Sequence, residues 1–552
     1  MARTINSRLK IDCLLEARTP LHVGGSGGSV DTDLALSTNG RSEYYIPGTS
    51  IAGALRAWLE TGLDDKKPKD HEKIKEIRRV WGYQESDKKK VLENEQSDKK
   101  EDEHASFVLV EDASIAVPPG KSIAVEIRDG VGIDRVTGAA ANQIKYDRAV
   151  MPRGTQFSFT IFVELDKDRE KTARAQIDAV IEALQGGLIR FGASKSRGLG
   201  RVEVKVLAVR EQGLLRKNGL LKTLRGESEL PEASQTKFEL ASRPRLTFEI
   251  GWRPRGSLMV KAEYDGLAVN MLPLISAIDA MQGDFSFILP GSSIKGALRS
   301  QAERIVRTLL DFKDLAPVVE KQDFINQLAV KKTQLELPSL IGWLFGVAGE
   351  AEKEKESDDS NEQYGSRSPS PGLSAVTLDD CYAELKFNAE QWANVEKAKD
   401  ENGLRGALDQ ANLHKAQQSF HVAIDRWLGS AADGFLYSVL ESHGVEWEAI
   451  CLTLDLSRLP DDVSRKQALM CVLLVLRDFA AGRIPLGHGT NRGMGAVEMT
   501  SLKVTTRDCE TPAWLKGAGD ISFAGGKLTI PPALRDELNK NWLNSKSGGQ
   551  IS

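Results

Sequence analysis

The sequence predicts an α+β chain that contains two tandem ferredoxin-like, or RRM-like, domains. Two observations predict this class. Blocks of sequence recur in the same order in the two halves of the chain. Each half also shows a strand, a helix, further strands, a second helix and a final strand, in that order. Helices packed on an antiparallel sheet in this order are typical of ferredoxin-like or split βαβ domains.

The repeat is visible in three pairs of blocks. Residues 46–59 (IPGTSIAGALRAWL) recur as residues 289–302 (LPGSSIKGALRSQA), and residues 131–165 recur around residues 422–456. A segment rich in glycine and cations near residue 198 recurs near residue 493. The offset between matched residues grows from 290 − 47 = 243 to 493 − 198 = 295, so the second copy is the longer one.

Local patterns justify each element in turn. An alternating strand opens each copy, at residues 8–17 and 243–252. The next helix follows a Pro-Gly pair, and Ser50 and Ser293 are its expected N-caps. The remaining elements of the first copy are strands at 106–113 and 156–165, an amphipathic helix at 173–188 and a hairpin of glycines and cations.

The repeat also sets the expected domain limits. The Ser/Pro-rich acidic segment near residue 360 has the composition of a disordered insertion, and the tail receives no role. The expected parts are a first domain (1–228) with a candidate catalytic loop (22–33) and a charged insertion (64–104), a linker (229–244), a second domain (245–510) with insertions at about 350–371 and about 386–418, and a tail (511–552).

Composition excludes several classes of protein. The 552 residues are 41% hydrophobic and 28% charged, which excludes collagen-like and wholly disordered chains. Five cysteines without a CxxC pair indicate neither a disulfide framework nor a zinc site, and favour a cytoplasmic location. The longest apolar run, residues 468–476, is too short to span a membrane.

The net charge of −4 is dominated by one segment. Residues 350–362 carry seven acids and two lysines, so the rest of the chain has a charge of +1. The overall charge therefore does not exclude a nucleic-acid partner. Whether the chain can bind nucleic acid depends on where its cations lie.

The loop at residues 22–33 (HVGGSGGSVDTD) is the candidate reactive segment. Its glycines, Gly24 and Gly25 among them, let a ligand approach the backbone, but no Gly-Lys-Ser/Thr follows, and Asp31 and Asp33 would repel a phosphate. A nucleotide-binding P-loop is therefore disfavoured. Two interpretations stay open: a plain turn-forming loop, or a loop that presents a carboxylate to a metal or to a reacting hydroxyl.

The hairpin at residues 190–201 has the composition of a polyanion-binding turn. Arg190, Lys195 and Arg197 lie among glycines, so that cations and backbone amides can both reach a phosphodiester chain. The second copy keeps this form. A single such turn is more often an ordinary exposed hairpin, but two in matching places favour RNA or DNA binding. The matched candidates are Arg483, His488, Asn491 and Arg492.

Taken together, these motifs resemble the RAMP superfamily. The resemblance rests on the PGTSIAGALR and PGSSIKGALR blocks, the Ile-Asp-Arg block and the two terminal glycine hairpins, and it covers about 1–207 and 245–503. The chain is similar to backbone subunits of type III CRISPR effector complexes. Two fused units in one chain resemble the double-copy subunit of subtype III-D-like complexes.

The resemblance implies a function in RNA targeting. Subunits of this family bind guide crRNA through the glycine hairpin and the PGSS helix, and they insert a thumb hairpin into the guide–target duplex. Catalytic members cut single-stranded target RNA with a divalent metal held at an aspartate of the first loop. Asp31 is matched to that position, with Asp33 as its alternate, and Asn270 is expected at the matching place in the second copy. We therefore expect one active and one inactive domain, unless Asp265 or Asp284 substitutes through a loop shift.

The remaining assignments follow from the same resemblance. A transient Mg²⁺ (or Mn²⁺) at Asp31 is the expected cofactor. The expected partners are the crRNA, the target RNA, a large polymerase-like subunit and further RAMP subunits, with no membrane. Contacts to RNA are expected from the two glycines of the first loop and from the PGTS and PGSS helices, through Ser50, Arg56, Ser293, Lys295 and Arg299.

Two alternatives stay open. The Asp-Arg pairs of the thumb block (Asp134, Arg135; Asp425, Arg426) are equally an internal ion pair or a ligand contact. For the whole chain, the alternatives to a target-RNA nuclease are a pure guide-RNA scaffold and a guide-precursor nuclease that uses His22 as a general base.

Overall fold

In a computed structural model, the chain forms two compact units. Unit 1 comprises Met1–Val125, Ala149–Lys195 and Gly200–Ala241, and unit 2 comprises Glu126–Arg148, Ser196–Leu199 and Ser242–Ser552. The residues that the structure describes are 4–25, 32–64, 67–83, 103–116, 123–215, 217–227, 229–230, 236–309, 317–320, 323–324, 327, 336–347, 373–507 and 512–543. The predicted insertion at 350–371, most of the predicted charged insertion and Asp31 lie outside these residues.

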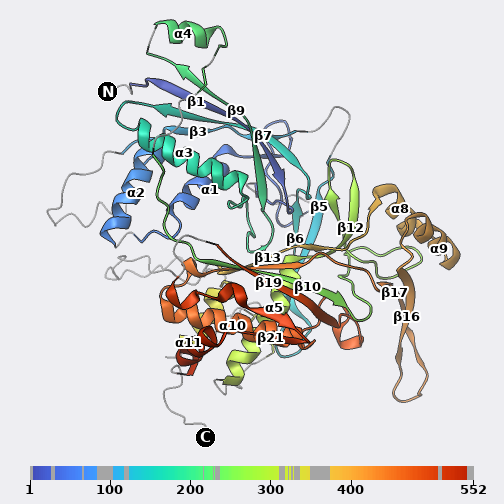
Figure 1. The fold of residues 1–552 in the computed structure, drawn as a ribbon. Coiled ribbons are helices and arrows are strands. Elements are labelled where there is room, and N and C mark those ends of the chain that lie inside the picture. Colours follow the sequence, from blue (N-terminus) through green and yellow to red (C-terminus); the bar gives the residue numbers. More distant parts are fainter. Residues whose placement is uncertain are drawn as a thin grey trace, which may run out of the picture. The chain divides into compact units, whose positions relative to one another are not determined.

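Unit 1 is an antiparallel sheet with helices packed on it (Figure 1). Its strand order is β2-β4-β7-β1-β9, with β3 also paired to β7. Alternate residues of β1, from Leu9 to Leu15, are buried, which is the pattern of a strand with one face on the core. Its elements are β1 (Ser7–Ala17), β2 (Tyr45–Ile46), α1 (Gly48–Glu60), α2 (Pro68–Trp81), β3 (Val108–Val110), β4 (Ala113–Ile115), β7 (Gln156–Leu165), α3 (Glu170–Gln185), β9 (Val202–Gly213) and α4 (Lys217–Leu224).

Unit 2 repeats this plan and enlarges it. A five-stranded sheet has the order β19-β10-β18-β13-β8, and a second sheet joins β11, β12, β14 and β15. Its elements are β8 (Arg197–Gly198), β10 (Arg245–Pro254), β11 (Ile275–Asp279), β12 (Asp284–Leu289), α5 (Gly291–Leu309), α7 (Glu336–Phe345), β13 (Val376–Asp379), β14 (Cys381–Tyr382), β15 (Phe387–Asn388), α8 (Ala389–Lys397), α9 (Glu401–Gln410), β18 (Ile450–Asp455), α10 (Asp462–Ala480), β19 (Val497–Arg507), β20 (Ser522–Ala524), β21 (Lys527–Thr529) and α11 (Pro532–Leu543).

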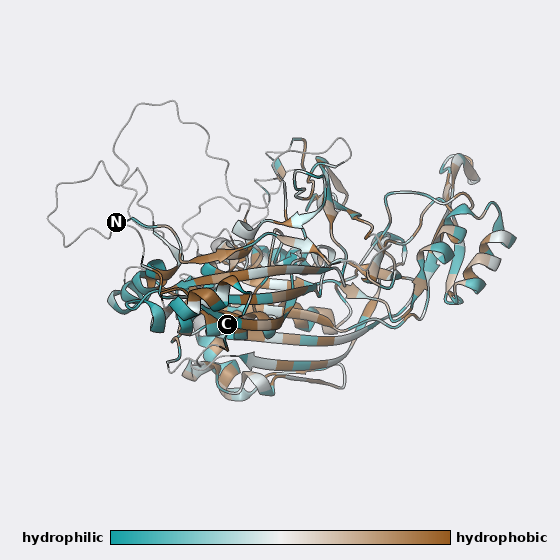
Figure 2. Cartoon of the chain, turned by 90° about the horizontal axis from the view of Figure 1, so that it is seen from above, coloured by the Kyte–Doolittle hydropathy of each residue, from teal (hydrophilic) through white to brown (hydrophobic). Residues whose placement is uncertain are grey.

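The two plans confirm the predicted α+β class and the tandem repeat. In each unit the opening strand lies between the strand that follows the hairpin and the last strand of the copy: β1 lies between β7 and β9, and β10 lies between β18 and β19. In Figure 2 the sheet strands carry most of the hydrophobic colour, and helices alternate between the two colours, as expected for helices with one buried face.

A long β-hairpin occurs in each copy. The first consists of β5 (Glu126–Ile133) and β6 (Ala140–Val150), and the second consists of β16 (Ala416–Ile424) and β17 (Ala431–Ser442). Although the β5–β6 hairpin belongs to the first repeat by sequence, residues 126–148 are part of unit 2. The β16–β17 hairpin extends away from the rest of unit 2 (Figure 1).

Residues 386–418 and the described part of the tail, residues 512–543, belong to unit 2. Residues 386–418 contain α8 and α9, which bury Trp392 and Leu404 in the core. The tail contributes β20, β21 and α11, and Leu534 and Leu538 of α11 are buried in the same core. The tail, for which the sequence predicted no role, therefore stabilises unit 2.

The predicted hydroxyl caps of α1 and α5 are wrong. Both helices begin at the glycine of the Pro-Gly pair, one turn before the expected start, and Ser50 and Ser293 lie exposed in the first turn. The caps are distant carboxylates: Gly48 N donates to Asp112 Oδ1 and Gly291 N donates to Asp380 Oδ1, each at 2.7 Å. Because these aspartates lie 64 and 89 residues away along the chain, a local pattern could not show them.

Candidate nucleic-acid interface

The glycine hairpin of the first copy packs against the backbone of the first loop in unit 1. Ala193 N donates to His22 O at 2.8 Å, and Gly200 N donates to Pro20 O at 2.9 Å. Gly192 has φ +76°, and a Cβ there would lie 2.1 Å from His22 O. Only glycine allows this approach. Two motifs separated by about 170 residues in sequence thus form one surface.

Unit 2 builds the same surface from matched residues. His488 N donates to Met259 O and Gly495 N donates to Ser257 O, each at 2.8 Å. Gly487, with φ +82°, is the counterpart of Gly192, and a Cβ there would lie 2.4 Å from Met259 O. The contact between loop and hairpin is therefore a structural feature that both domains share.

A substitution tests this close approach. We expect Gly192→Ala to lower the stability of unit 1 by more than the ~1 kcal/mol usual for a glycine with positive φ, because the methyl group would also overlap a backbone oxygen. Gly187→Ala is the matched control, since Gly187 has φ +63° but its nearest neighbour would be 3.5 Å away. Urea unfolding of both variants measures the difference. Equal losses would contradict the close packing of hairpin and loop.

The structure corrects the register of the first loop between the copies. The bridges Gly24–Leu36 and Lys261–Pro273 close loops of equal length, with an offset of 261 − 24 = 237 at both ends. Asn270 is therefore the counterpart of Asp33, and Ala268 is the counterpart of Asp31. The expectation that Asn270 matches Asp31 is wrong by two residues, because sequence matching had no fixed point inside this loop.

Equal loop lengths also remove the proposed loop shift. Asp265 stays within the loop, 3.7 Å from Lys261, and Asp284 lies on β12 in a 2.6 Å ion pair with Lys386. Asn270 is held by β17: its Oδ1 accepts from Ser438 N at 2.8 Å. Unit 2 thus has no carboxylate at either matched position, whereas unit 1 has Asp33, which is exposed, and Asp31, which lies outside the described residues.

The described residues contain no preformed metal centre. No group of three or more His, Cys, Asp or Glu side chains in the described part of the chain is arranged to hold a metal ion. The donors that the sequence offers in unit 1 are the carboxylates of Asp31 and Asp33, which suit Mg²⁺ because this ion binds through one or two carboxylates and keeps several waters.

An arginine and a tyrosine pair in each copy. Arg197 Nη1 donates to Tyr146 Oη at 3.2 Å, and Arg492 Nη1 donates to Tyr437 Oη at 2.5 Å. Arg492 also lies 5.5 Å from the centre of the Tyr437 ring. Sequence reasoning missed both tyrosines, although they match at an offset of 437 − 146 = 291, the offset of the thumb block. Tyr437 is also stacked on His421, with ring centres 5.3 Å apart, and Arg148 lies 5.8 Å from the centre of the Tyr146 ring. Each pair therefore holds an exposed arginine beside an aromatic ring.

The other hairpin candidates differ in exposure. Arg483 is exposed and donates to Asp478 at 3.3 Å, and Asn491 is exposed in the 3₁₀ turn Thr490–Arg492. Lys195 is exposed, and Arg190 is half-buried beside Arg201. Burial, with Arg492 and Lys261 nearby, lowers the pKa of His488, so it is neutral at pH 7 and adds no charge.

The helix candidates divide in the same way. Arg56 donates to Glu60 at 2.9 Å and Arg299 donates to Glu303 at 2.7 Å, so both arginines carry a carboxylate partner within their own helix. Lys295 is only 5% exposed, and its Nζ donates to Ser196 O, Ser196 Oγ and Ser374 Oγ. Burial lowers the pKa of Lys295 well below its usual value. This geometry makes Lys295 a clamp on the tip of the first glycine hairpin rather than an exposed cation.

A comparison with protein families identifies the repeated unit. The sequence model of the RAMP superfamily matches residues 14–203 and 278–498, which is most of the chain and includes both copies. The chain belongs to the RAMP superfamily. It is a two-domain RAMP protein, and the superfamily consists of CRISPR-associated RNA-binding proteins. No curated protein matches this sequence.

His22 of this RAMP protein has a structural environment. It is 4% exposed, and its Nδ1 lies 2.7 Å from Ala149 O, so the ring lies inside unit 1 at the point where the glycine hairpin crosses the first loop. A general base must reach a substrate proton, and burial works against this role. The geometry therefore favours packing over catalysis for His22.

In neither Asp-Arg block do the aspartate and the arginine pair with each other. The blocks lie in the turns at the hairpin tips, and Arg135 pairs instead with Glu303 of α5, at 2.7 Å. Asp425 Oδ1 accepts from Trp427 N at 2.7 Å and forms a turn, while Arg426 is exposed. Asp134 accepts from Val136 N and Gln327 Nε2; burial raises its pKa, but these hydrogen bonds outweigh burial and lower it to about 2.

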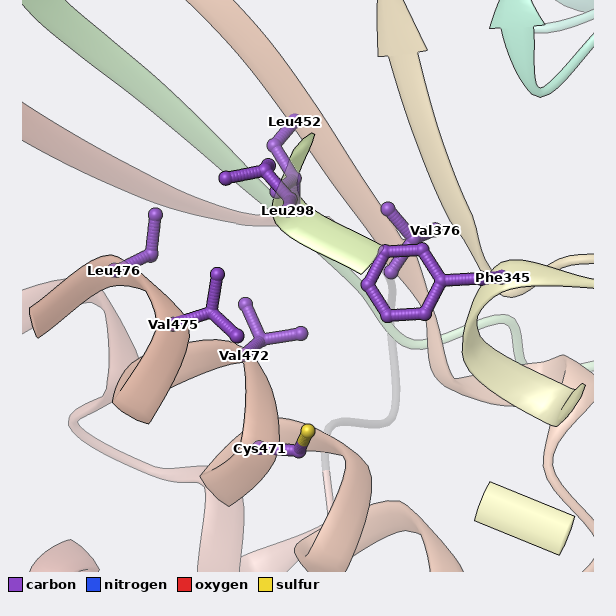
Figure 3. A pocket seen from close by; sticks show the side chains of 8 residues that line it. All are labelled: Leu298, Phe345, Val376, Leu452, Cys471, Val472, Val475 and Leu476. Atoms are coloured by element: carbon purple, nitrogen blue, oxygen red, sulfur yellow. The ribbon is translucent and has the colours of Figure 1, made fainter. Parts of the chain in front are cut away.

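A pocket in the core of unit 2 is a packing gap. It lies between α10 and the sheet and is lined by apolar side chains and one thiol (Figure 3). Burial raises the pKa of that thiol, Cys471, to about 12, so it is neither a nucleophile nor a metal ligand at neutral pH. Among the described helices, none is long and apolar enough to cross a membrane.

Proposed function

We propose that this RAMP protein is the guide-RNA-binding backbone subunit of a type III CRISPR ribonucleoprotein, of the fused double-copy kind seen in III-D-like complexes. The first domain is the metal-dependent endoribonuclease that cuts the guide-paired target RNA, and the second is mainly a scaffold. The observation that carries the proposal is a difference between two otherwise matched loops. The counterparts of Asp31 and Asp33 of unit 1 are Ala268 and Asn270 in unit 2.

The chemistry follows from the structure of RNA. A 2′-hydroxyl attacks the adjacent phosphorus only when the leaving 5′-oxygen lies in line, which a splayed nucleotide allows and a regular A-form helix resists. The attack forms the 2′-O–P bond and breaks the P–O5′ bond. The 2′-hydroxyl gives its proton to a base and the leaving 5′-oxygen takes up a proton, so the products are a 2′,3′-cyclic phosphate and a 5′-hydroxyl. Glycines beside the loop let the RNA backbone approach, and Asp31 orients the attacking hydroxyl.

A bound Mg²⁺ would supply charge stabilisation at the phosphate oxygens. Asp31, with Asp33 as alternate, would hold it. In unit 2 an amide at position 270 cannot act as a base and is a weaker magnesium ligand, and its Oδ1 is already hydrogen-bonded to Ser438. This loop supports the scaffold role of the second domain. The second candidate function is a pure guide-RNA scaffold, in which neither domain cuts RNA.

Guide binding provides the first test. We expect the double variant Lys195→Ala, Arg197→Ala and the single variant Arg492→Ala to bind single-stranded RNA at least 10-fold more weakly than the wild-type chain at about 0.15 M salt, with a smaller salt dependence, because phosphate contacts are lost. Lys503→Ala is the control, since Lys503 is exposed on β19 and belongs to neither hairpin. Filter binding at several salt concentrations measures both quantities. Unchanged affinity in the hairpin variants would overturn the guide-binding proposal.

A further inference from the structure

The tip of the first glycine hairpin is the edge strand of the five-stranded sheet in unit 2. Residues 196–199 belong to this unit, and within them β8 pairs in parallel with β13, with Arg197 opposite Leu378. Leu378 N also donates to Ser196 O, at 3.4 Å. The backbone on either side of the exposed Arg197 side chain is therefore fixed by the sheet of unit 2.

A glycine lets the tip lie directly against the start of α5. Gly198 has φ +97°, and a Cβ there would lie 2.1 Å from Asp380 Oδ1 and 3.2 Å from Gly291 N. These are the two groups that form the cap of α5. Only glycine allows so close an approach, so the residue after Arg197 is held between β13 and the helix.

Lys295 of α5 holds the residue before Arg197. Lys295 is 5% exposed, and its Nζ donates to Ser196 Oγ at 3.0 Å and to Ser196 O at 3.2 Å. A third bond, to Ser374 Oγ at 2.6 Å, ties the same side chain to the segment that leads into β13. One buried side chain thus joins the hairpin tip, α5 and the sheet.

The surroundings of Lys295 disfavour a direct contact with RNA. Burial lowers its pKa well below the usual value, and Arg197, Arg299 and Arg458 lower it further. Its hydrogen bonds lie within unit 2, and almost none of its surface is exposed. An effect of Lys295 on RNA binding would therefore pass through the tip that it holds.

The tip of the second glycine hairpin is closed differently. Arg492 N and Met494 N both donate to Gly489 O, at 2.8 and 3.3 Å, so these bonds lie inside the hairpin itself. Gly493 is the counterpart of Gly198, and in the described part of the chain nothing lies within 4 Å of a Cβ added there. The clamp by a buried lysine is thus a feature of the first hairpin.

We propose that Lys295 is a positioning residue for RNA binding, which holds Ser196 so that Arg197 of the first hairpin is already placed for a phosphate. Because the tip is ordered in advance, less conformational entropy is lost when RNA binds. The inference rests on the proposed guide binding by the glycine hairpins, and it adds the residue that prepares one of them.

Double-mutant cycles in the full-length chain test the positioning role. We expect Lys295→Met to bind single-stranded RNA about 10-fold more weakly than the wild-type chain, in filter binding at about 0.15 M salt. In the Lys195→Ala, Arg197→Ala chain it should add less than about 2-fold, because the cation that it places is already absent. In the Arg492→Ala chain it should keep its full effect, since the second hairpin does not depend on it.

Hydrogen exchange of residues 196–199 measures the clamp without RNA. We expect faster exchange in Lys295→Met than in the wild-type chain, because the tip loses two hydrogen bonds. Ser286→Ala is the control. It removes another buried hydrogen bond of unit 2, from Ser286 Oγ to Ala383 O at 2.7 Å, which does not involve the hairpin. This control should change neither the exchange of the tip nor the affinity for RNA.

The outcomes separate this inference from the proposed guide binding. Hairpin variants that bind RNA as tightly as the wild-type chain overturn guide binding itself. If those variants bind weakly but Lys295→Met does not, or if Lys295→Met adds the same loss in both backgrounds, only the positioning role is overturned. Should Lys295→Met fail to fold, Ser374→Ala removes one bond of the clamp and is expected to show the same pattern with a smaller loss.

Discussion

Replacing Arg128 with alanine is expected to lower the free energy of unfolding of unit 2 by about 3–5 kcal/mol, the usual cost of removing one partner of a buried ion pair. The reason is the state of the groups left behind. Arg128 Nη1 donates to Asp380 Oδ2 at 2.6 Å. Without this bond, the Gly291 N–H is the one donor left to Asp380 among the described residues, and Glu126 loses a 3.2 Å contact with the guanidinium, both inside unit 2. Both carboxylates are largely buried, so solvent has little access to replace the arginine.

Urea unfolding followed by tryptophan fluorescence measures this effect. Seven of the nine tryptophans belong to unit 2, so the signal reports mainly on that unit. Lys145→Ala is the matched control on the same hairpin, since Lys145 is 55% exposed and its pairs with Asp129 and Glu263 are surface pairs worth less than about 1 kcal/mol. A loss for Arg128→Ala no larger than that for Lys145→Ala would show that the hairpin is not anchored by this arginine.

Replacing Asp31 with alanine is expected to reduce cleavage of guide-paired target RNA by about 100-fold to 10,000-fold, the range typical of a positioned acid–base group, without loss of RNA binding. EDTA should have the same effect on the wild-type chain, because the metal would be held at this loop. Single-turnover cleavage with magnesium, with and without EDTA, measures both. The comparison variants are Asp33→Ala and His22→Ala.

The outcomes separate the three functions that the sequence leaves open. Cleavage that needs Asp31 and a metal supports the nuclease. Cleavage that is insensitive to EDTA and lost only in His22→Ala would support the guide-precursor nuclease, against the burial of that ring. If the wild-type chain in the assembled complex cuts no RNA, the scaffold is the one function of the three that remains.

Much of the fold was predictable because the repeat made each element visible twice. The α+β class, the opening strands, the order of helices and strands and the glycine hairpins follow from patterns of neighbouring residues, and the structure agrees with them. The packing of residues 386–418 and of the tail could not be predicted, for a physical reason. α8, α9 and α11 are short helices whose stability comes from Trp392, Leu404 and Leu534 packing into a distant core.

The parts of the site that could not be predicted all depend on contacts distant in sequence. The caps of α1 and α5 come from Asp112 and Asp380, and the burial of Lys295 depends on Ser196 and Ser374. The register that matches Asn270 with Asp33 became visible only from the bridges that close each loop. Local sequence patterns predict which residues form a helix or strand. They do not predict which distant residue caps or pairs with it.

Mapping the cut positions on a target RNA tests the central claim most directly. The claim is that the first domain cuts and the second does not. Sequencing of the 5′-hydroxyl ends should show one set of cuts for each chain in the complex, absent in Asp31→Ala and unchanged in Asn270→Ala. A set of cuts that persists in Asp31→Ala and disappears in Asn270→Ala would contradict the assignment of the active domain.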